Sequence, residues 1–172
     1  MESTWFCRIE GSVIDMKVLV VYDTVSVGKM TGQVAEIIKE TLKENGVDVD
    51  SFYVKDVDLA AVKNYDVLIA GGPTMAFRPS TGIMEFLNGL ADGGFSGKQA
   101  AAFDTQLKMI ISGNATKGIE KKLKSLGFNI IMQPLVVYVE SKGKNVWQFK
   151  SGEQEKAKTW AQEAAKNLNE QK

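Results

Sequence analysis

Three polar stretches of the chain combine residue types that suit phosphate or heterocycle binding. The first, YDTVSVGKMT, contains Thr24, Ser26, Gly28, Lys29 and Thr31 directly before a helical pattern begins. Hydroxyl groups donate hydrogen bonds, glycine lets the backbone turn tightly, and the start of a helix presents free amides with a positive dipole. The stretch therefore predicts a phosphate-binding loop, with a solvated polar turn as the alternative.

Two common nucleotide motifs are absent from this first stretch. The pattern GxxxxGK[ST] is not met, because Asp23 stands where its first glycine belongs and Met30 follows the lysine. The dinucleotide pattern GxGxxG is not met either, since the nearest glycines are spaced differently. A phosphate here would thus be held by a different arrangement of amides and hydroxyls.

The second stretch, GGPTMAFRP, places apolar side chains on a bend. Two glycines and Pro73 precede Thr74, and Met75 and Phe77 follow. Apolar groups at such a position either cover a flat aromatic ligand or tuck back under the next helix. Both interpretations stay open on the sequence.

The third stretch, DTQLKMIISGNA, mixes hydrogen-bonding and apolar side chains. Asp104, Thr105 and Gln106 could bond the edge of a heterocycle. The apolar residues that follow, Leu107, Met109, Ile110 and Ile111, could line the same ligand or form a dimer surface. A homodimer is therefore a possible assembly.

Alternating strand and helix patterns must position these stretches. Short Val- and Leu-rich runs predict buried strands, and apolar residues four apart predict helices. The strands are expected at 17–22, 47–54, 66–72, 98–104 and 129–139, the last bent at Pro134, and the helices from about Thr31, at 82–90, at 115–126 and at 153–168. This alternation predicts a parallel sheet with helices on both faces. The three polar stretches, taken as loops at 23–31, 73–81 and 104–114, then follow the carboxyl ends of three strands, where ligands collect.

Composition narrows the possible functions. The 172 residues suit one domain, and 21 Lys and Arg against 21 Asp and Glu give no net basic field for nucleic acid. Without histidine, Ser-His-Asp hydrolysis and His-containing zinc sites are excluded. No apolar stretch suits a membrane span, so no membrane partner is expected. The single cysteine indicates a reducing, cytoplasmic location.

Charge and the first residues indicate further organisation. From Lys117 onward there are 11 lysines and 6 acids, which leaves 10 cations and 15 acids before it. This asymmetry could steer a charged partner or reflect solvated helix faces. Residues 1–15 lack the pattern of a secretion signal and precede a good start at Met16. We expect an N-terminal extension at 1–15 and one domain at 16–172.

Together these stretches resemble the flavodoxin family. VLVVYDTVSVGKMTGQVAEIIKETL resembles its first strand, phosphate loop and first helix, DVLIAGGPTMAFRPSTGIMEFL its third strand and ring-side loop, and GKQAAAFDT its fourth strand. The resemblance implies an α/β three-layer sandwich with a five-stranded parallel sheet in the order 2-1-3-4-5. It also implies flavin mononucleotide (FMN) as the cofactor.

The resemblance also implies which residues hold FMN. The phosphate loop would comprise Thr24, Ser26, Val27, Gly28, Lys29, Met30 and Thr31. One side of the isoalloxazine ring would contact Pro73, Thr74, Met75, Ala76 and Phe77. The other side would contact Asp104, Thr105, Gln106 and Leu107. No catalytic or metal-binding residue is implied.

Two departures from the family pattern concern the cofactor. Lys29 and Met30 replace the usual Gly-Asn pair of the phosphate loop, so that a lysine could pair with the phosphate. The third stretch lacks the aromatic residue that stacks on the ring, and Gln106 and Leu107 stand there instead. Phe77 could substitute if the second stretch folds over the ring.

We expect an FMN-binding electron carrier that docks transiently on redox partner proteins. The absence of a recognisable nicotinamide motif favours a carrier over a self-contained oxidoreductase. Two alternatives stay open: an FMN-dependent NAD(P)H or quinone oxidoreductase, and a flavodoxin-like interaction module that has lost its flavin.

Overall fold

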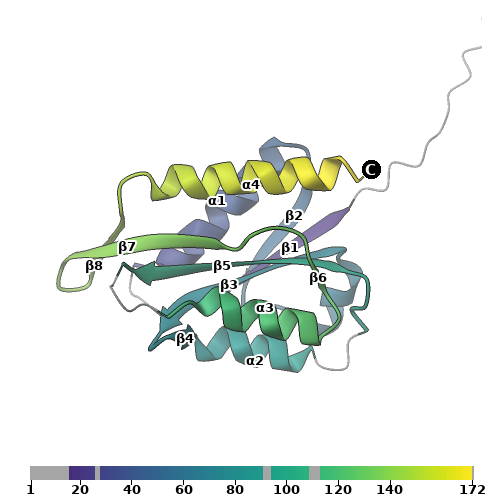
Figure 1. The fold of residues 1–172 in the computed structure, drawn as a ribbon, viewed down its shortest axis with the longest axis horizontal. Helices are drawn as coiled ribbons and strands as arrows, with labels where there is room; N and C mark the ends of the chain where they lie inside the picture. The colour runs from purple at the N-terminus through teal and green to yellow at the C-terminus, as the bar shows by residue number, and fades with distance from the viewer. Residues whose placement is uncertain (1–15, 26–27, 91–93, 109–112, 172) are drawn as a thin grey trace, which may run out of the picture.

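A central sheet lies between two pairs of helices (Figure 1). The computed structural model describes residues 16–25, 28–90, 94–108 and 113–171. Its strands are β1 (Lys17–Tyr22), β2 (Asp48–Tyr53), β3 (Val67–Met75), β4 (Arg78–Pro79), β5 (Gln99–Leu107), β6 (Asn129–Ile130), β7 (Leu135–Gly143) and β8 (Val146–Phe149). Its helices are α1 (Met30–Glu44), the short 3₁₀ helix η1 (Leu59–Asn64), α2 (Thr81–Gly89), α3 (Ala115–Ser125) and α4 (Glu153–Asn169). Helices α1 and α4 cover one face of the sheet, and α2 and α3 cover the other.

The sheet is mostly parallel, as predicted, but it is larger than the predicted five strands. Its main path runs β2-β1-β3-β5-β7-β8, with β4 paired to β3 and β6 paired to β5, which makes eight strands among the described residues. Strand β8 runs antiparallel to β7 and forms one edge. The prediction of a five-stranded 2-1-3-4-5 sheet is therefore incomplete.

The predicted fifth strand divides at its proline. Residues 129–139 form β6 and the start of β7, each paired separately with β5, and Pro134 lies between them. Proline has no backbone N–H to donate to a ladder, so the strand is interrupted there. The chain then continues to Gly143 and returns as β8, a strand that the sequence analysis did not predict.

The interior consists of two apolar layers, one on each side of the sheet. Along β1, Val18 and Val20 face α1 and α4, and Leu19 and Val21 face α2 and α3. All four are buried, which explains the continuous apolar run of this strand. None of the described helices has both the length and the apolar character needed to cross a membrane.

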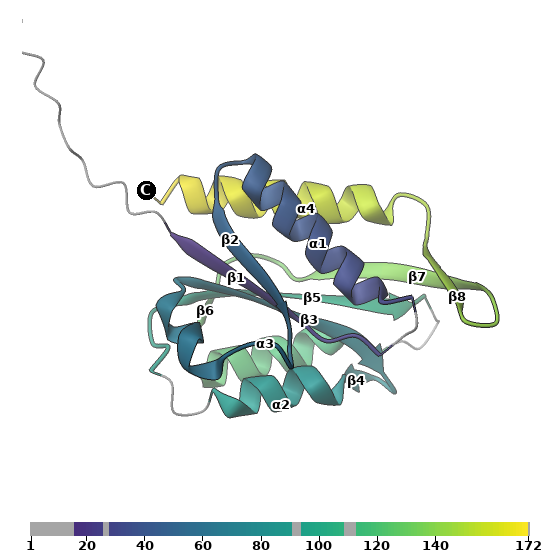
Figure 2. The same cartoon turned by 180° about the vertical axis from the view of Figure 1, so that it is seen from behind.

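Strands β3 and β5 extend further toward their carboxyl ends than predicted. Residues 73–75 and 104–107 were expected in loops, but they belong to β3 and β5. The two extensions pair with each other through Pro73 and Thr105, and the end of β5 also pairs with β7. These ladders between distant segments keep both stretches extended. Viewed from behind, the carboxyl ends of β3 and β5 lie at the same end of the molecule as the start of α1 (Figure 2).

Candidate functional site

The first predicted loop leaves β1 at Asp23 and closes onto the start of α1. The Thr24 hydroxyl oxygen is buried and has no hydrogen-bond partner among the described residues. Lys29 caps α1 in a left-handed conformation with φ of 47°, without a side-chain hydrogen bond to the first turn. The side-chain amide of Gln33 donates a hydrogen bond to the Gly28 carbonyl at 2.8 Å. Within the described part of the chain, no side chain caps the first amides of α1, as an anion site needs.

The other predicted residues of this loop have different environments. Ser26 and Val27 lie outside the described residues. Met30 is buried, and the Thr31 hydroxyl lies 2.7 Å from the hydroxyl of Thr105 on β5. The structure thus brings two predicted site residues into direct contact. The Thr31 hydroxyl holds α1 against the sheet, a tertiary role that the loop pattern did not indicate.

The second predicted segment is a tight hairpin between β3 and β4. Met75 pairs with Arg78, and the two residues between them, Ala76 and Phe77, both have positive φ, 44° and 69°. Met75 is 47% exposed and Phe77 is 60% exposed, so neither tucks under the following helix. Gly113 lies against the Phe77 backbone with no room for a Cβ atom, which supports the hairpin from behind. The hairpin therefore presents an apolar tip at the carboxyl edge of the sheet.

Asp104 is fully buried at the base of the site. Its Oδ2 accepts hydrogen bonds from the Thr74 hydroxyl at 2.8 Å and from the Ala115 amide at 3.1 Å, at the start of α3. Its Oδ1 has no partner among the described residues. Burial raises the pKa of Asp104 to about 6, against the opposing effect of these hydrogen bonds. The carboxylate thus joins β3, β5 and α3, and it keeps one acceptor oxygen free.

The last predicted residues lie at the end of β5. Gln106 is only 7% exposed, and its carbonyl oxygen has no partner within the described part of the chain. Leu107 is exposed. Because side chains alternate along a strand, Gln106 and Asp104 lie on one face of the sheet, and Thr105 lies on the other. The predicted ligand or dimer surface cannot be located, because it includes residues outside the described ones: Met109, Ile110 and Ile111.

Buried polar atoms without partners concentrate in these segments. Among the described residues five such side-chain atoms are found, on Thr24, Ser80, Gln99, Asp104 and Gln106. Thr24 lies just after β1, Ser80 lies between β4 and α2, and Asp104 and Gln106 lie in the last part of β5. Gln99 lies at the other end of β5. Buried polar groups in folded proteins are normally hydrogen-bonded, so a cluster of unpaired ones indicates a ligand or ordered water.

One aromatic residue near the first loop was missed by the sequence analysis. Trp147 on β8 lies so close to Gly28 that a Cβ atom on the glycine would be 3.2 Å from the Trp147 Cβ. Trp147 is half-buried. The run VWQF after Gly143 and Asn145 is a hairpin signal that could have predicted this strand. The contact with the first loop could not be predicted, because it joins segments more than a hundred residues apart.

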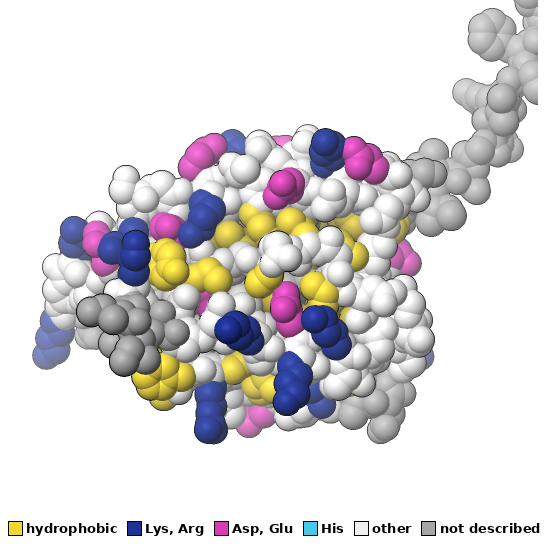
Figure 3. Space-filling view, viewed as in Figure 1, with side chains coloured by type: hydrophobic (Ala, Val, Ile, Leu, Met, Phe, Trp, Pro, Cys, Tyr) yellow, Lys and Arg dark blue, Asp and Glu magenta, His cyan; other side chains and the backbone are white. Residues whose placement is uncertain are grey.

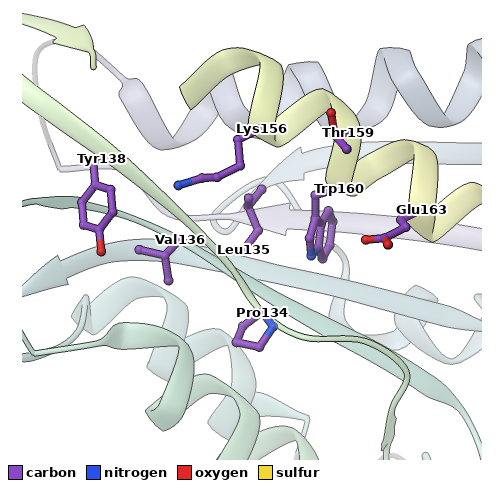
Figure 4. A pocket seen from close by; sticks show the side chains of 8 residues that line it. All are labelled: Pro134, Leu135, Val136, Tyr138, Lys156, Thr159, Trp160 and Glu163. Carbon is purple, nitrogen blue, oxygen red and sulfur yellow. The ribbon is translucent and has the colours of Figure 1, made fainter. Parts of the chain in front are cut away.

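A hollow of about 580 Å³ lies elsewhere, between β7 and α4 (Figure 4). In it the Lys156 side chain extends toward Tyr138, with its Nζ 5.0 Å from the ring centroid. Its lining residues are Pro134, Leu135, Val136, Tyr138, Lys156, Thr159, Trp160 and Glu163. None of the predicted site residues lines this hollow. No group of three or more His, Cys, Asp or Glu residues that could hold a metal ion exists in the part of the chain that the structure describes.

Comparisons with solved structures identify the fold. A flavodoxin from the domain Archaea superposes with a TM-score of 0.73 at 23% identity, over 89% of this chain and 99% of that one. Flavodoxin 1 from Bacillus cereus gives 0.71 at 18% identity, over 87% and 97%. Rubredoxin oxygen:oxidoreductase from Desulfovibrio gigas gives 0.71 at 21% identity, over 90% of this chain but 36% of that chain. No protein-family model and no curated protein matches the sequence. The predicted resemblance is therefore confirmed at the level of the fold: this chain has a flavodoxin-like fold.

Proposed function

We propose that this protein binds FMN at the carboxyl edge of its sheet and carries electrons between partner proteins. The observation that supports the proposal best is the group of buried polar atoms on Thr24, Ser80, Asp104 and Gln106, which have no hydrogen-bond partner among the described residues. Thr24, Asp104 and Gln106 belong to the segments that the resemblance assigns to the cofactor, and Ser80 lies three residues after the assigned segment 73–77. A ligand with a phosphate and a hydrogen-bonding ring satisfies such a set of groups.

The residues present fit the parts of FMN. The Thr24 hydroxyl and the amides at the start of α1 suit the phosphate, and the exposed Lys29 adds a positive charge. The exposed side chains of Met75, Phe77 and Leu107 suit the faces of the ring. When bound, FMN supplies the ability to accept one or two electrons.

We assign the cofactor contacts to the full predicted set. The phosphate contacts are Thr24 and residues 26–31, and the ring contacts are residues 73–77 and 104–107. We further assign residues 16–172 to the flavodoxin-like domain and residues 1–15, which lie outside the described residues, to an N-terminal extension.

Replacing Thr24 by valine tests the phosphate assignment. Thr24→Val keeps the shape of the side chain and removes its hydroxyl. A hydrogen bond to a charged acceptor contributes about 1.5–3 kcal/mol, so FMN affinity is expected to fall roughly 10- to 100-fold. The affinity for riboflavin, which lacks the phosphate, is expected to stay nearly unchanged. Both affinities are measured by quenching of flavin fluorescence.

Thr41→Val, at a buried position near the far end of α1, is the matched control. It is expected to leave both affinities unchanged. Equal losses for FMN and riboflavin in Thr24→Val would contradict the phosphate assignment. A purified protein whose visible absorption spectrum shows no flavin, and that binds no added FMN, would contradict the function itself.

A turnover assay separates the carrier from the oxidoreductase alternative. An electron carrier is expected to leave NADH and NADPH unoxidised in the presence of a quinone unless a separate reductase is added. Oxidation of either nucleotide by the FMN-loaded protein alone would favour the enzyme.

A further inference from the structure

Charge is separated across the width of the sheet although the whole chain is neutral. Residues 36–58, in α1, β2 and the turn after it, contain 3 lysines and 7 acids. Residues 73–80, 104–108, 115–125 and 140–150 contain 9 Lys or Arg residues and 3 acids. The acidic segments lie toward the β2 edge of the main strand path, whereas the basic segments extend from β3 and β5 to the β8 edge. Attraction of an anionic partner would therefore be directed to one side.

The exposed cations beside the carboxyl ends of β3, β5 and β7 and on α3 form what we call the basic face. It comprises Arg78, Lys108, Lys117, Lys121, Lys142 and Lys144. Figure 3 shows Lys and Arg side chains over the end where β7 and β8 lie and across the half occupied by α2 and α3, with a few Asp and Glu side chains among them.

The basic face is continuous with the candidate cofactor site. Gly118 of α3 packs closely against Pro79, which is next to Arg78. A Cβ atom placed on Gly118 would lie only 2.6 Å from the proline ring. Lys108 directly follows β5, the strand that carries Gln106 and Leu107. An approaching partner would thus contact the basic face and the proposed cofactor site together.

The acids within the same segments offset only part of this positive charge. Asp104 is fully buried, so it adds no exposed charge, and Glu140 lies 3.0 Å from Lys142 in an ion pair that offsets this one lysine. Glu120 is half-buried among the lysines of α3. The exposed charge of the basic face is therefore predominantly positive.

Exposed apolar side chains at the edge of the basic face favour a protein over a nucleic acid as the partner. Met75, Phe77, Leu107 and Val146 are four of the seven large apolar side chains that are exposed among the described residues. Protein interfaces combine such an apolar centre with a charged rim. Nucleic-acid binding domains instead carry a large net positive charge, whereas this chain has a net charge of zero and a pI of about 6.4.

We propose that the basic face docks a partner protein that presents a cluster of Asp and Glu side chains. The proposal rests on the proposed function in taking that partner to be a redox protein. Docking there would bring the partner next to the hairpin tip and the end of β5, where the edge of the bound cofactor is expected.

Nuclear magnetic resonance with an oligoglutamate peptide tests the basic face directly. Added to the isotope-labelled protein, the peptide is expected to shift amide signals of α3 and of the β7–β8 hairpin, and to lose affinity as salt is raised. In the double variant Lys108→Glu and Lys144→Glu, affinity is expected to fall at least tenfold. The matched control, Lys43→Glu with Lys63→Glu, changes two exposed lysines toward the acidic edge and is expected to bind as the unaltered protein does.

The outcomes separate this inference from the proposed function. Shifts confined to α1 and β2, equal losses in the two double variants, or tighter binding of a single-stranded DNA oligonucleotide than of the peptide would overturn it. Because the peptide is added to protein both with and without FMN, failure to bind flavin contradicts the electron-carrier function without affecting the peptide result. Peptide binding in the absence of any flavin affinity would support an acidic partner but overturn its redox nature.

Discussion

At the scale of single residues, Asp104 shows how burial changes the role of a residue that was predicted to contact the cofactor. The sequence placed it in a loop beside the ring, and the structure places it in β5, fully buried and bonded to Thr74 and to the start of α3. Its pKa rises to about 6 from an ordinary 3.8, chiefly because burial penalises the charged form. An acid whose pKa is higher in the folded state stabilises the fold below its unfolded pKa and ceases to do so as the pH rises through its folded pKa.

Replacing Asp104 by asparagine is expected to remove this pH dependence. A folded pKa of about 6 against an unfolded pKa of 3.8 corresponds to roughly 3 kcal/mol, so the free energy of unfolding should fall by about that amount between pH 3 and pH 7. Asp104→Asn keeps an acceptor for Thr74 and Ala115 and cannot ionise. Urea unfolding at several pH values measures the difference, with Asp48→Asn on the exposed start of β2 as the control. The same pH dependence in Asp104→Asn and the unaltered protein would refute the assignment.

Gly71 illustrates the same point for a residue without a side chain. In the sequence it is one of two glycines at the end of the predicted strand 66–72, where the second polar stretch begins. In the structure it lies inside β3 opposite Phe103, whose ring occupies the place of a Cβ atom. The glycine therefore provides room for an aromatic ring from the neighbouring strand and does not act as a hinge.

At the scale of elements, the hairpin between β3 and β4 contains an unusual turn. Two-residue hairpin turns with positive φ at both positions favour Asn-Gly, and here Ala76 and Phe77 occupy them. Residues other than glycine in such conformations cost on the order of 1 kcal/mol each. Strain of this kind concentrates at functional sites, and here it holds an exposed phenyl ring beside the proposed cofactor site.

Replacing Phe77 by glycine is expected to stabilise the fold and weaken flavin binding. Glycine adopts positive φ without strain, so the free energy of unfolding should rise by about 1 kcal/mol. Loss of the ring contact should lower the affinity for both FMN and riboflavin. Asn145→Gly in the β7–β8 turn, where φ is also positive, is the matched control and is expected to leave flavin affinity unchanged. Unchanged affinity for both flavins in Phe77→Gly would show that the hairpin tip does not cover the ring.

At the scale of the whole molecule, one layered domain accounts for every described segment. The two apolar layers involve all four α-helices, and β1 begins at Lys17, one residue after the proposed start of the domain. The separated charges and the site at one edge of the sheet follow from the same strand order. The domain is thus expected to fold and bind its cofactor without residues 1–15.

Deleting residues 1–15 tests this domain assignment. The shortened protein is expected to keep its FMN affinity within about a factor of two. Its thermal midpoint is expected to stay within about 2 °C, which is less than the shift of a few degrees that a loss of 1 kcal/mol of stability would cause. Fluorescence titration and calorimetry on both proteins measure the two quantities. A loss of flavin binding on deletion would show that the first residues belong to the site.

Local sequence patterns were sufficient to predict the parallel sheet and the helices that cover it. The continuous apolar run of β1 and the four-residue spacing of apolar residues in α1 predicted these elements close to their observed bounds. Because each pattern reflects burial on one or both faces, the parallel sheet and its two helical layers followed from them. The placement of three polar segments at one edge of the sheet followed in turn.

Tertiary contacts decided the chemistry of the site. Residues 104–107 became strand because β7 pairs with them, the Thr31 hydroxyl was directed to Thr105, and Trp147 came to lie against Gly28. Each of these contacts joins segments at least thirty residues apart in the chain. The spacing of apolar residues along a segment indicates whether it forms a helix or a strand. Which group contacts a given hydroxyl or ring depends instead on which distant segment the fold brings beside it.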